Sequence, residues 1–435
     1  MTARELSVAS AERRYVALTA LRWFPLGISI PVTVLLASSR GLSAADIGVV
    51  FAVHSVVALT LELPTGGLAD VIGIRPVLVL SALLQIAGFL TLAIAHNLLA
   101  FGVAFALVGA GRALDSGPLE AWYVDAVHLH DDGADVTAGL ARAAVVEGAG
   151  LALGAVVGGL APALAASSDA LVLPFLLAAA IDVVYLVAVV ALVVPLGPTN
   201  DTPAAVLTVR SIVRDTVRLA ARDRVLRQLL TLAFLVGTVL STLELIGPLR
   251  LAELTGSRTE GTAVFGVVMA ASFTAAAFGS ALATTARRAA RGSLARTSAA
   301  LFAICVLAVS GIALTSALLM TGFAYAVFYL ANAAGWPLRQ QLMHSRVQAA
   351  QRSTSVSALS FALMIGVVAG SLLVPRLAEA TSLSVAFWAA AAPLLLAGLL
   401  SLRLPSASDA STEHGQTGDD MAPDAAQHAT QQTGN

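Results

Sequence analysis

Long apolar segments, separated by short polar or glycine- and proline-containing breaks, dominate the pattern of this chain. A helix that crosses the hydrocarbon core of a bilayer needs roughly 20 mostly apolar residues. The fourth and fifth segments are the least regular, because both carry ionisable residues. The pattern predicts an all-α integral membrane protein with twelve transmembrane helices over residues 15–37, 46–66, 77–96, 99–124, 139–164, 170–195, 225–249, 260–285, 295–317, 319–341, 354–376 and 383–403.

The largest polar break follows the sixth predicted helix and divides the chain into two sets of six. It carries Arg210, Arg214, Arg218 and Arg222, whose spacing places them on one face of a helix. This break is either an amphipathic helix on anionic headgroups or a solvated linker whose charge retains it in the cytoplasm. We expect a cytoplasmic N-terminus, a six-helix half, a cytoplasmic linker, a second six-helix half and a disordered cytoplasmic tail over residues 1–14, 15–195, 196–224, 225–403 and 404–435.

Composition agrees with a bilayer environment. Hydrophobic residues make up 58% of the 435 residues and charged residues 12%, whereas about 25% of an average soluble domain is charged. Cytoplasmic loops retain positive charge, and most arginines fall on cytoplasmic segments when the N-terminus is placed inside. We therefore expect a monomeric, multi-pass protein of the cell membrane (plasma or inner), surrounded by the lipid bilayer, with both termini cytoplasmic. The net charge of -1 gives no indication of nucleic acid binding.

Several kinds of chemistry have no residues to support them. The lone Cys305 lies in an apolar segment, which excludes a disulfide framework or a cysteine metal site within the chain. The sequence has no phosphate-binding loop of the G-x-x-x-x-G-K-[ST] kind, no His/Glu zinc cluster and no nucleophile motif. We expect no enzymatic activity, no cofactor and no metal site.

The loop after the second predicted helix, residues 66–75, reads GGLADVIGIR. Its glycines permit a tight turn, and its acidic and basic residues place opposite charges at the cytoplasmic membrane edge. It resembles the signature loop of the major facilitator superfamily, G-x-L-a-D-r-x-G-r-R/K, although Val71 and Ile74 replace residues that are often basic there. The resemblance implies that this loop governs gating, with the acidic residue tying the two halves together on the cytoplasmic side. The residues that take this role are Gly66, Asp70, Gly73 and Arg75.

Ionisable residues inside the predicted helices suggest proton coupling. An arginine at the centre of a membrane helix costs about 2.5–3.5 kcal/mol, so Arg112 should have a function and a partner, of which Asp115 is the nearest within its helix. This segment resembles the R-x-x-x-G element of proton-coupled family members, with Gly117 one residue late. Apolar surroundings disfavour ionised carboxyl groups, a property that proton coupling requires. We expect coupling, rather than purely structural pairing, at Arg112, Asp115, Glu147 and Asp182.

Glycines are spaced four apart in the fifth predicted helix, which gives it a small face that another helix can approach closely. The segment resembles the antiporter motif of drug exporters in the same superfamily, G-x-x-x-G-P-x-x-G-G, with Ala155 in place of the proline. The resemblance implies antiport rather than symport, and a general packing stripe is the alternative. The motif residues are Gly150, Gly154, Gly158 and Gly159.

Aromatic and polar residues on one face of the tenth predicted helix suggest a substrate cavity. Such a wall favours flat, apolar or cationic molecules through stacking and cation–π contact, and an aromatic packing stripe is the alternative. Arg22 of the first helix could pair with Glu62 of the second. We expect the cavity to include Arg22, Glu62, Glu244, Tyr325, Tyr329, Asn332 and Trp336.

The resemblance covers about residues 12–404 and implies two six-helix halves, each built from inverted three-helix repeats, around a central cavity. The expected function is secondary active transport, in which a small amphipathic compound such as a drug or secondary metabolite is exported in exchange for protons. Two alternatives remain open: a proton-coupled symporter of a nutrient or metabolite, and a transport-inactive membrane sensor or scaffold.

Overall fold

The computed structural model describes residues 6–65, 68–131, 133–165, 169–195, 214, 221, 223–346 and 352–404. This part of the chain is helical, and twelve of its helical stretches are long and apolar enough to cross a membrane. The hydrophobic pattern therefore predicted the fold class correctly. Most of the predicted linker and nearly all of the predicted tail lie outside the described residues.

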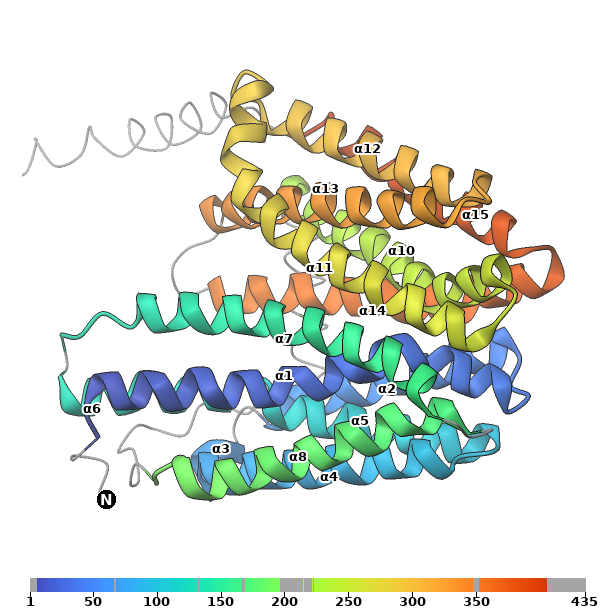
Figure 1. The fold of residues 1–435 in the computed structure, drawn as a ribbon. Helices are drawn as coiled ribbons and strands as arrows, with labels where there is room; N and C mark the ends of the chain where they lie inside the picture. Colours follow the sequence, from blue (N-terminus) through green and yellow to red (C-terminus); the bar gives the residue numbers. More distant parts are fainter. Residues whose placement is uncertain are drawn as a thin grey trace, which may run out of the picture.

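The helices form two groups of six spans that lie side by side (Figure 1). The first group consists of α1 (Val8–Ser39), α2 (Ala44–Thr65), α4 (Ile74–Ile94), α5 (Leu98–Asp115) with α6 (Pro118–His130), α7 (Thr137–Leu164) and α8 (Leu173–Leu192), with the short helix α3 (Leu68–Ile72) before α4 and a 3-10 turn (Ala170–Val172) before α8. The second consists of α10 (Arg224–Thr255), α11 (Arg258–Ala289), α12 (Leu294–Leu314), α13 (Leu318–Ser345), α14 (Arg352–Ala380) and α15 (Leu383–Ser401).

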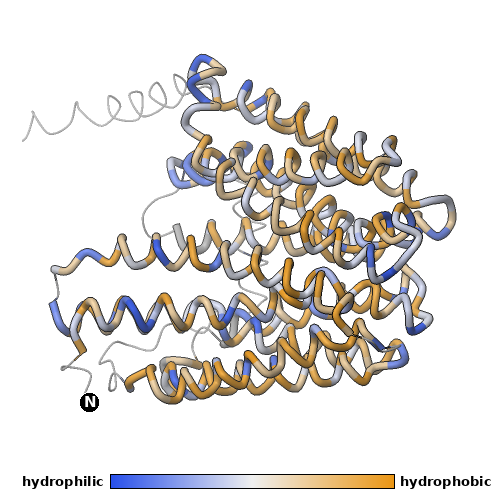
Figure 2. Tube along the Cα trace, viewed as in Figure 1, coloured by the Kyte–Doolittle hydropathy of each residue, from blue (hydrophilic) through white to orange (hydrophobic). Residues whose placement is uncertain are grey.

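Hydropathy along the helices fits a lipid-facing surface. The spans are apolar over most of their length, and hydrophilic positions gather toward their ends (Figure 2). Large apolar side chains such as Leu99, Leu164 and Leu319 are exposed on the outside. In water such a surface would drive association, whereas in a bilayer it contacts acyl chains. Within each helix the backbone polar groups are paired along the helix, as the hydrocarbon region requires.

The fourth span is interrupted rather than continuous, and in this respect the predicted helix over 99–124 was wrong. α5 ends at Asp115, and α6 begins at Pro118 and runs to His130. Proline lacks the N–H that would continue the helix, and Gly117 has a φ of 100°, which favours glycine. The break allows the Ser116 hydroxyl to donate a hydrogen bond to Glu62 Oε1 at 2.8 Å.

The two groups of helices make close contacts at the end of the bundle opposite the N-terminus (Figure 1). There Gly48 of α2 packs against the Ser371 carbonyl of α14. The Ala45 N–H in the first turn of α2 donates a hydrogen bond to Glu379 Oε1 of α14 at 2.8 Å. A third contact joins α7 to α11, as described below. These contacts hold the halves together at one end of the molecule.

Candidate functional site

An ion pair inside the first six-helix group joins α1 to α5. Arg22 Nε donates to Asp115 Oδ2, and the Asp115 side chain is almost fully buried. The Tyr185 hydroxyl of α8 donates to Asp115 Oδ1 at 3.4 Å. The ion-pair partner of Asp115 is therefore Arg22 rather than Arg112, although the charges of Arg112 and Asp115 also interact. Arg22 accordingly pairs with Asp115 and not with Glu62, the partner suggested for it from the sequence. Spacing along one helix reveals which residues share a face, but not which neighbouring helix supplies the partner.

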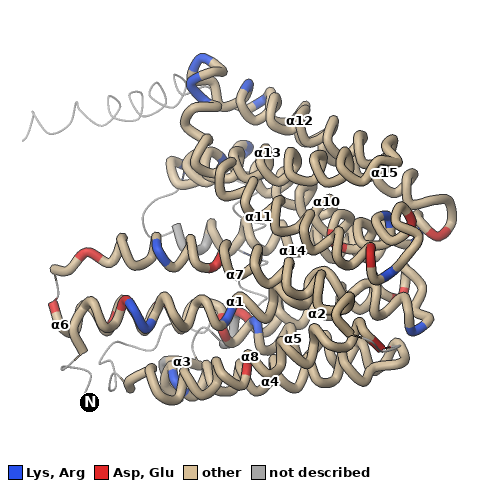
Figure 3. Tube along the Cα trace, in the orientation of Figure 1, with Lys and Arg blue, Asp and Glu red and all other residues tan. Residues whose placement is uncertain are grey.

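Arg112 lies beside this ion pair, where charged residues gather within an otherwise uncharged part of the bundle (Figure 3). Its guanidinium carbon lies 5.7 Å from the centroid of the Trp23 ring. Among the described residues Arg112 has no ion pair within 4 Å, but the carboxylates of Glu62, Glu147 and Glu244 interact with its charge. These residues belong to α2, α7 and α10. Arg112 is therefore a positive charge shared by acidic residues of three helices.

Glu244 brings an acidic group of the second half to this cluster. Its side chain is exposed, whereas its neighbours Leu243 and Leu245 are buried, and its charge interacts with that of Arg112 on α5. The interaction links the two halves electrostatically. Although several carboxylates gather here, the described residues include no group of His, Cys, Asp or Glu side chains placed to hold a metal ion.

Asp182 of α8 is a second buried carboxyl group next to the Arg22–Asp115 pair. It is 4% exposed, and its Oδ2 atom has no hydrogen-bond partner among the described residues. Its charge interacts with that of Asp115. Burial of an unpartnered carboxylate is costly, and binding a proton removes that cost. Asp182 thus has the environment expected of a group that can take up a proton.

The glycine motif of α7 has two packing roles. A Cβ atom added at Gly154 or Gly158 would lie 2.5 Å from Phe24 O or 2.0 Å from Ile28 O, so the stripe permits close packing of α7 against α1. Gly159 faces the other half. A Cβ atom at Gly159 would lie 2.9 Å from the Cα atom of Gly266 in α11. The motif therefore supports packing both within the first half and between the halves.

The predicted gating loop is only partly described. Gly66 lies outside the described residues, and Asp70 belongs to α3, although the position of its side chain is outside the description. Gly73 has a φ of 87° between α3 and α4, a conformation that favours glycine. Arg75 donates to Val190 O of α8, a contact within the first half. The gating role of these residues stays a prediction.

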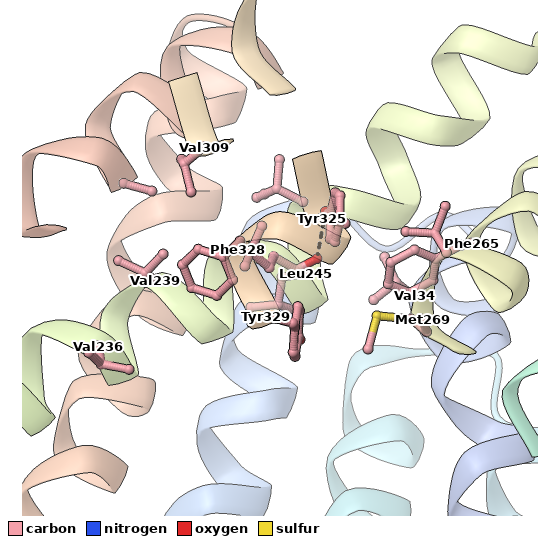
Figure 4. Packing of buried hydrophobic residues seen from close by; sticks show 14 of the residues in the cluster. Val34, Val236, Val239, Leu245, Phe265, Met269, Val309, Tyr325, Phe328 and Tyr329 are labelled. Atoms are coloured by element: carbon pink, nitrogen blue, oxygen red, sulfur yellow. Dashed lines mark hydrogen bonds between the residues drawn. The ribbon is translucent and has the colours of Figure 1, made fainter. Parts of the chain in front are cut away.

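The aromatic face of α13 is divided between packing and the interior of the bundle. Tyr325 is fully buried and its hydroxyl donates to Leu243 O at 3.1 Å (Figure 4). Tyr329 makes edge-to-face contacts with Phe273 and Phe328, and its hydroxyl interacts with the charge of Glu244. Asn332 and Trp336 are half-buried. Both side chains are buried and both hydroxyls interact with the charge of Glu244. They differ in that the Tyr325 hydroxyl is bound to Leu243 O, whereas no hydrogen bond of the Tyr329 hydroxyl is recorded among the described residues.

A cavity of about 160 Å³ lies next to the cluster, between α1, α6 and α7. Polar and aromatic residues line it: Tyr15, Thr19, Arg22, Trp23, Glu120 and Glu147. Sequence analysis did not identify Tyr15 or Glu120. Glu120 had a usable signal, because it is an ionisable residue within the fourth predicted span. Nothing in the sequence distinguished Tyr15 from other aromatic residues near a helix end.

Sequence analysis also missed Arg339 in α13. This arginine is 5% exposed, and its guanidinium carbon lies 5.1 Å from the Phe302 ring centroid and 6.0 Å from that of Trp336. Its Nη2 atom has no hydrogen-bond partner among the described residues. The sequence contained the same indication of a functional residue for Arg339 as for Arg112, because both are arginines inside a predicted membrane helix.

Comparisons with known proteins place these observations in context. A family model described as Major Facilitator Superfamily matches residues 16–333. The fold is similar to that of the nucleoside transporter NupG (TM-score 0.75, 12% identity, 91% of this chain and 98% of that chain). It is also similar to the peptide transporter POT in complex with sulfate (TM-score 0.70, 15% identity, 92% of this chain and 97% of that chain). A third similar structure is a bacterial homolog of the human lysosomal transporter Spinster, inward-facing and unoccupied (TM-score 0.67, 13% identity, 91% of this chain and 95% of that chain). The comparison with curated proteins found no sequence relative.

Proposed function

The chain belongs to the major facilitator superfamily of secondary transporters, and we propose that it exports a small amphipathic compound across the cell membrane in exchange for protons. The observation that carries this proposal is the position of Arg112, whose charge interacts with carboxylates of both halves. Charges within a membrane protein mark pathways for ions, protons or substrates. Arg112 carries such a charge, and it interacts with acidic residues of both halves.

The proposed mechanism follows from that charge arrangement. Arg112 lies in the first half and Glu244 in the second, so the attraction between them depends on whether Glu244 is ionised. A proton that binds Glu244 weakens the attraction between Arg112 and the second half and biases the relative arrangement of the halves. Glu147 lies in the same half as Arg112, and a proton that binds it changes the charge of the cluster within that half. Asp182 and the Arg22–Asp115 pair, on the other side of the cluster, relay or sense the proton. Movement of the halves then exposes the site to the opposite face of the membrane.

The orientation in the membrane determines on which side the halves make close contact. The arginine distribution predicts a cytoplasmic N-terminus, and the end where the halves make close contact is the opposite one. With this orientation the contact end faces outward. Alternating access passes through such a state in either direction of transport, so the proposed direction rests on the glycine motif. Asp70 and Arg75 would then act at the cytoplasmic end when it closes. The glycine motif of α7, which resembles that of drug antiporters, supports exchange over symport.

Vesicle transport tests the proposal. A growth screen in an efflux-deficient host first identifies a substrate. In inverted vesicles loaded with acid, addition of that substrate should release protons, and Glu147→Gln or Arg112→Gln should abolish the release while expression in the membrane is unchanged. Glu253→Gln provides the control, because Glu253 is exposed and pairs with Arg250 away from the cluster. Normal transport by both variants would refute the assignment.

Two alternative functions give different results. A nutrient or metabolite symporter would cause substrate-induced alkalinisation outside intact cells rather than proton release from inverted vesicles. A transport-inactive sensor or scaffold would show no substrate flux, and deletion of the segment after Pro405 would remove its phenotype.

A further inference from the structure

We propose that the cavity between α1, α6 and α7 is a subsite for a protonated amine, so that the transported compound is a cation whose amine group binds there. The inference rests on the proposed transport function and adds the chemical class of the substrate. The residues that carry it are Tyr15, Trp23, Glu120 and Glu147, all of which line the cavity.

Two carboxylates give this cavity its selectivity. Glu120 lies in the first turn of α6, directly after the break in the fourth span, and Glu147 lies near the middle of α7. The charges of these two residues interact with one another, although Glu147 interacts more strongly with Arg22 and Arg112. Like charges that face one cavity repel, and among the described residues neither carboxylate has a recorded ion pair. A cation placed between them removes the repulsion and gains two charge-assisted hydrogen bonds.

The cavity does not suit an anion, although Arg22 also lines it. The guanidinium group of Arg22 is already paired with Asp115. An anion would have to compete with that buried pair and approach Glu120 and Glu147 as well. Asp115, which already holds Arg22, and the carboxylates of Glu120 and Glu147 would therefore oppose binding of an anion.

Tyr15 provides a hydrogen-bonding group that lacks a partner. Its side chain is 6% exposed, and its ring stacks on Tyr123 with the centroids 4.6 Å apart. Among the described residues no hydrogen bond to its hydroxyl is recorded, and the hydroxyl interacts with the charges of Glu120, Arg22 and Glu147. A tyrosine oxygen can accept a hydrogen bond from an ammonium N–H. The stacked ring holds this acceptor in place at the cavity wall.

The size of the cavity limits what it can hold. Its volume of about 160 Å³ is close to that of a cavity that binds benzene, about 150 Å³. Sites for whole drug-sized ligands are larger, about 300–1,000 Å³. The subsite therefore fits an amine with a small attached ring or chain, and the rest of a larger substrate extends beyond it. The Trp23 ring lines the same cavity, and the guanidinium carbons of Arg22 and Arg112 lie 5.0 and 5.7 Å from its centroid.

A pair of probes of similar shape tests the proposal. Binding of benzylammonium and of neutral benzyl alcohol to the full-length protein in lipid nanodiscs is measured by calorimetry at pH 7. We expect the wild type to bind benzylammonium more tightly than benzyl alcohol. Glu120→Gln should weaken benzylammonium binding about tenfold or more, because a charge-assisted hydrogen bond is lost, and leave benzyl alcohol binding unchanged. Tyr15→Phe, which keeps the stacked ring, should weaken benzylammonium binding about threefold to tenfold.

Glu12→Gln is the matched control, because Glu12 is also an acidic residue of the first half, pairs with Arg142 and does not line the cavity. It should bind both probes like the wild type. Equal affinity of the wild type for the two probes, or unchanged benzylammonium binding by Glu120→Gln, would overturn the proposal. The amine subsite and the transport function can fail independently. If the wild type exchanges protons for a neutral substrate, the transport function stands and the amine subsite does not. Selective benzylammonium binding without proton exchange would retain only the subsite.

Discussion

Arg22 of α1 and Asp115 of α5 form an ion pair inside the bundle, and the hydroxyl of Tyr185 in α8 contacts the same carboxylate. The pair therefore ties together helices that are far apart in sequence. Desolvation makes a buried pair expensive, and loss of one partner leaves the other charge uncompensated. Arg22 and Asp115 should consequently behave as one unit in stability measurements.

Removal of one partner tests this coupling. Asp115→Asn should lower the free energy of unfolding by about 3–5 kcal/mol, because it leaves the Arg22 guanidinium without its partner. The double variant Arg22→Gln with Asp115→Asn should recover most of the loss, since neither charge then remains buried. Denaturant unfolding of the purified protein in detergent measures the free energy of unfolding of the wild type, the two single variants and the double variant. Additive losses in the double variant would show that the two residues contribute independently.

The sequence was sufficient to predict the twelve spans, because the length of an apolar run relates directly to the thickness of the bilayer. It also contained the information for the break in the fourth span. Gly117 and Pro118 are adjacent there, and proline cannot continue a helix. The apolar run over residues 99–124 continues through this pair, and hydropathy alone therefore predicts one continuous helix.

The site was harder to predict, because its contacts join different helices. Spacing correctly identified Arg112, Asp115, Glu147 and Asp182 as ionisable residues within spans, but it could not show that α1 supplies the partner of Asp115. Burial was similarly hidden for Tyr325 and Tyr329, which share a helical face and are both buried. Only tertiary packing shows that the Tyr325 hydroxyl reaches Leu243 O of α10.

Tyr325 and Tyr329 should differ in function because the hydroxyl of Tyr325 is bound to Leu243 O, whereas no hydrogen bond of the Tyr329 hydroxyl is recorded among the described residues. Tyr325→Phe loses the hydrogen bond to Leu243 O and should lower the free energy of unfolding by about 0.5–1.5 kcal/mol, with little change in transport. Tyr329→Phe removes a hydroxyl that interacts with the charge of Glu244, as that of Tyr325 does, but is free to bind a proton or substrate, and it should slow transport more than it lowers stability. Thermal unfolding and vesicle uptake measure the two effects. Equal changes in transport would contradict this division.

Close packing of Gly159 against Gly266 should control opening of the contact end. A valine at residue 159 places a Cβ atom 2.9 Å from the Gly266 Cα atom, and overpacking of this kind costs about 1–3 kcal/mol. Gly159→Val should therefore shift the ratio of closed to open molecules by about fivefold or more. Spin labels on cysteines at Leu99 and Leu319, in a Cys305→Ala background, report the distance between the halves at this end.

Gly148→Val is the matched control for this prediction. Gly148 lies on the same helix, and a Cβ atom added there would meet nothing within 4 Å. The label distances of this variant should equal those of the parent protein. A similar shift in both variants would attribute the effect to a general loss of α7 stability rather than to the contact between the halves.

The hydrogen bond from Ala45 N–H to Glu379 Oε1 should act as a second contact that holds the same end closed. The carboxylate accepts from the first turn of α2, where an acidic group is favoured by the unpaired N–H groups and the helix dipole. Loss of such an acceptor costs about 1 kcal/mol, so Glu379→Ala should raise the open population about fivefold, as measured by the label pair at Leu99 and Leu319. Glu253→Ala removes an exposed carboxylate whose partner, Arg250, lies on its own helix, and should leave the distances unchanged. Unchanged distances in Glu379→Ala would mean that packing of the glycines alone keeps this end closed.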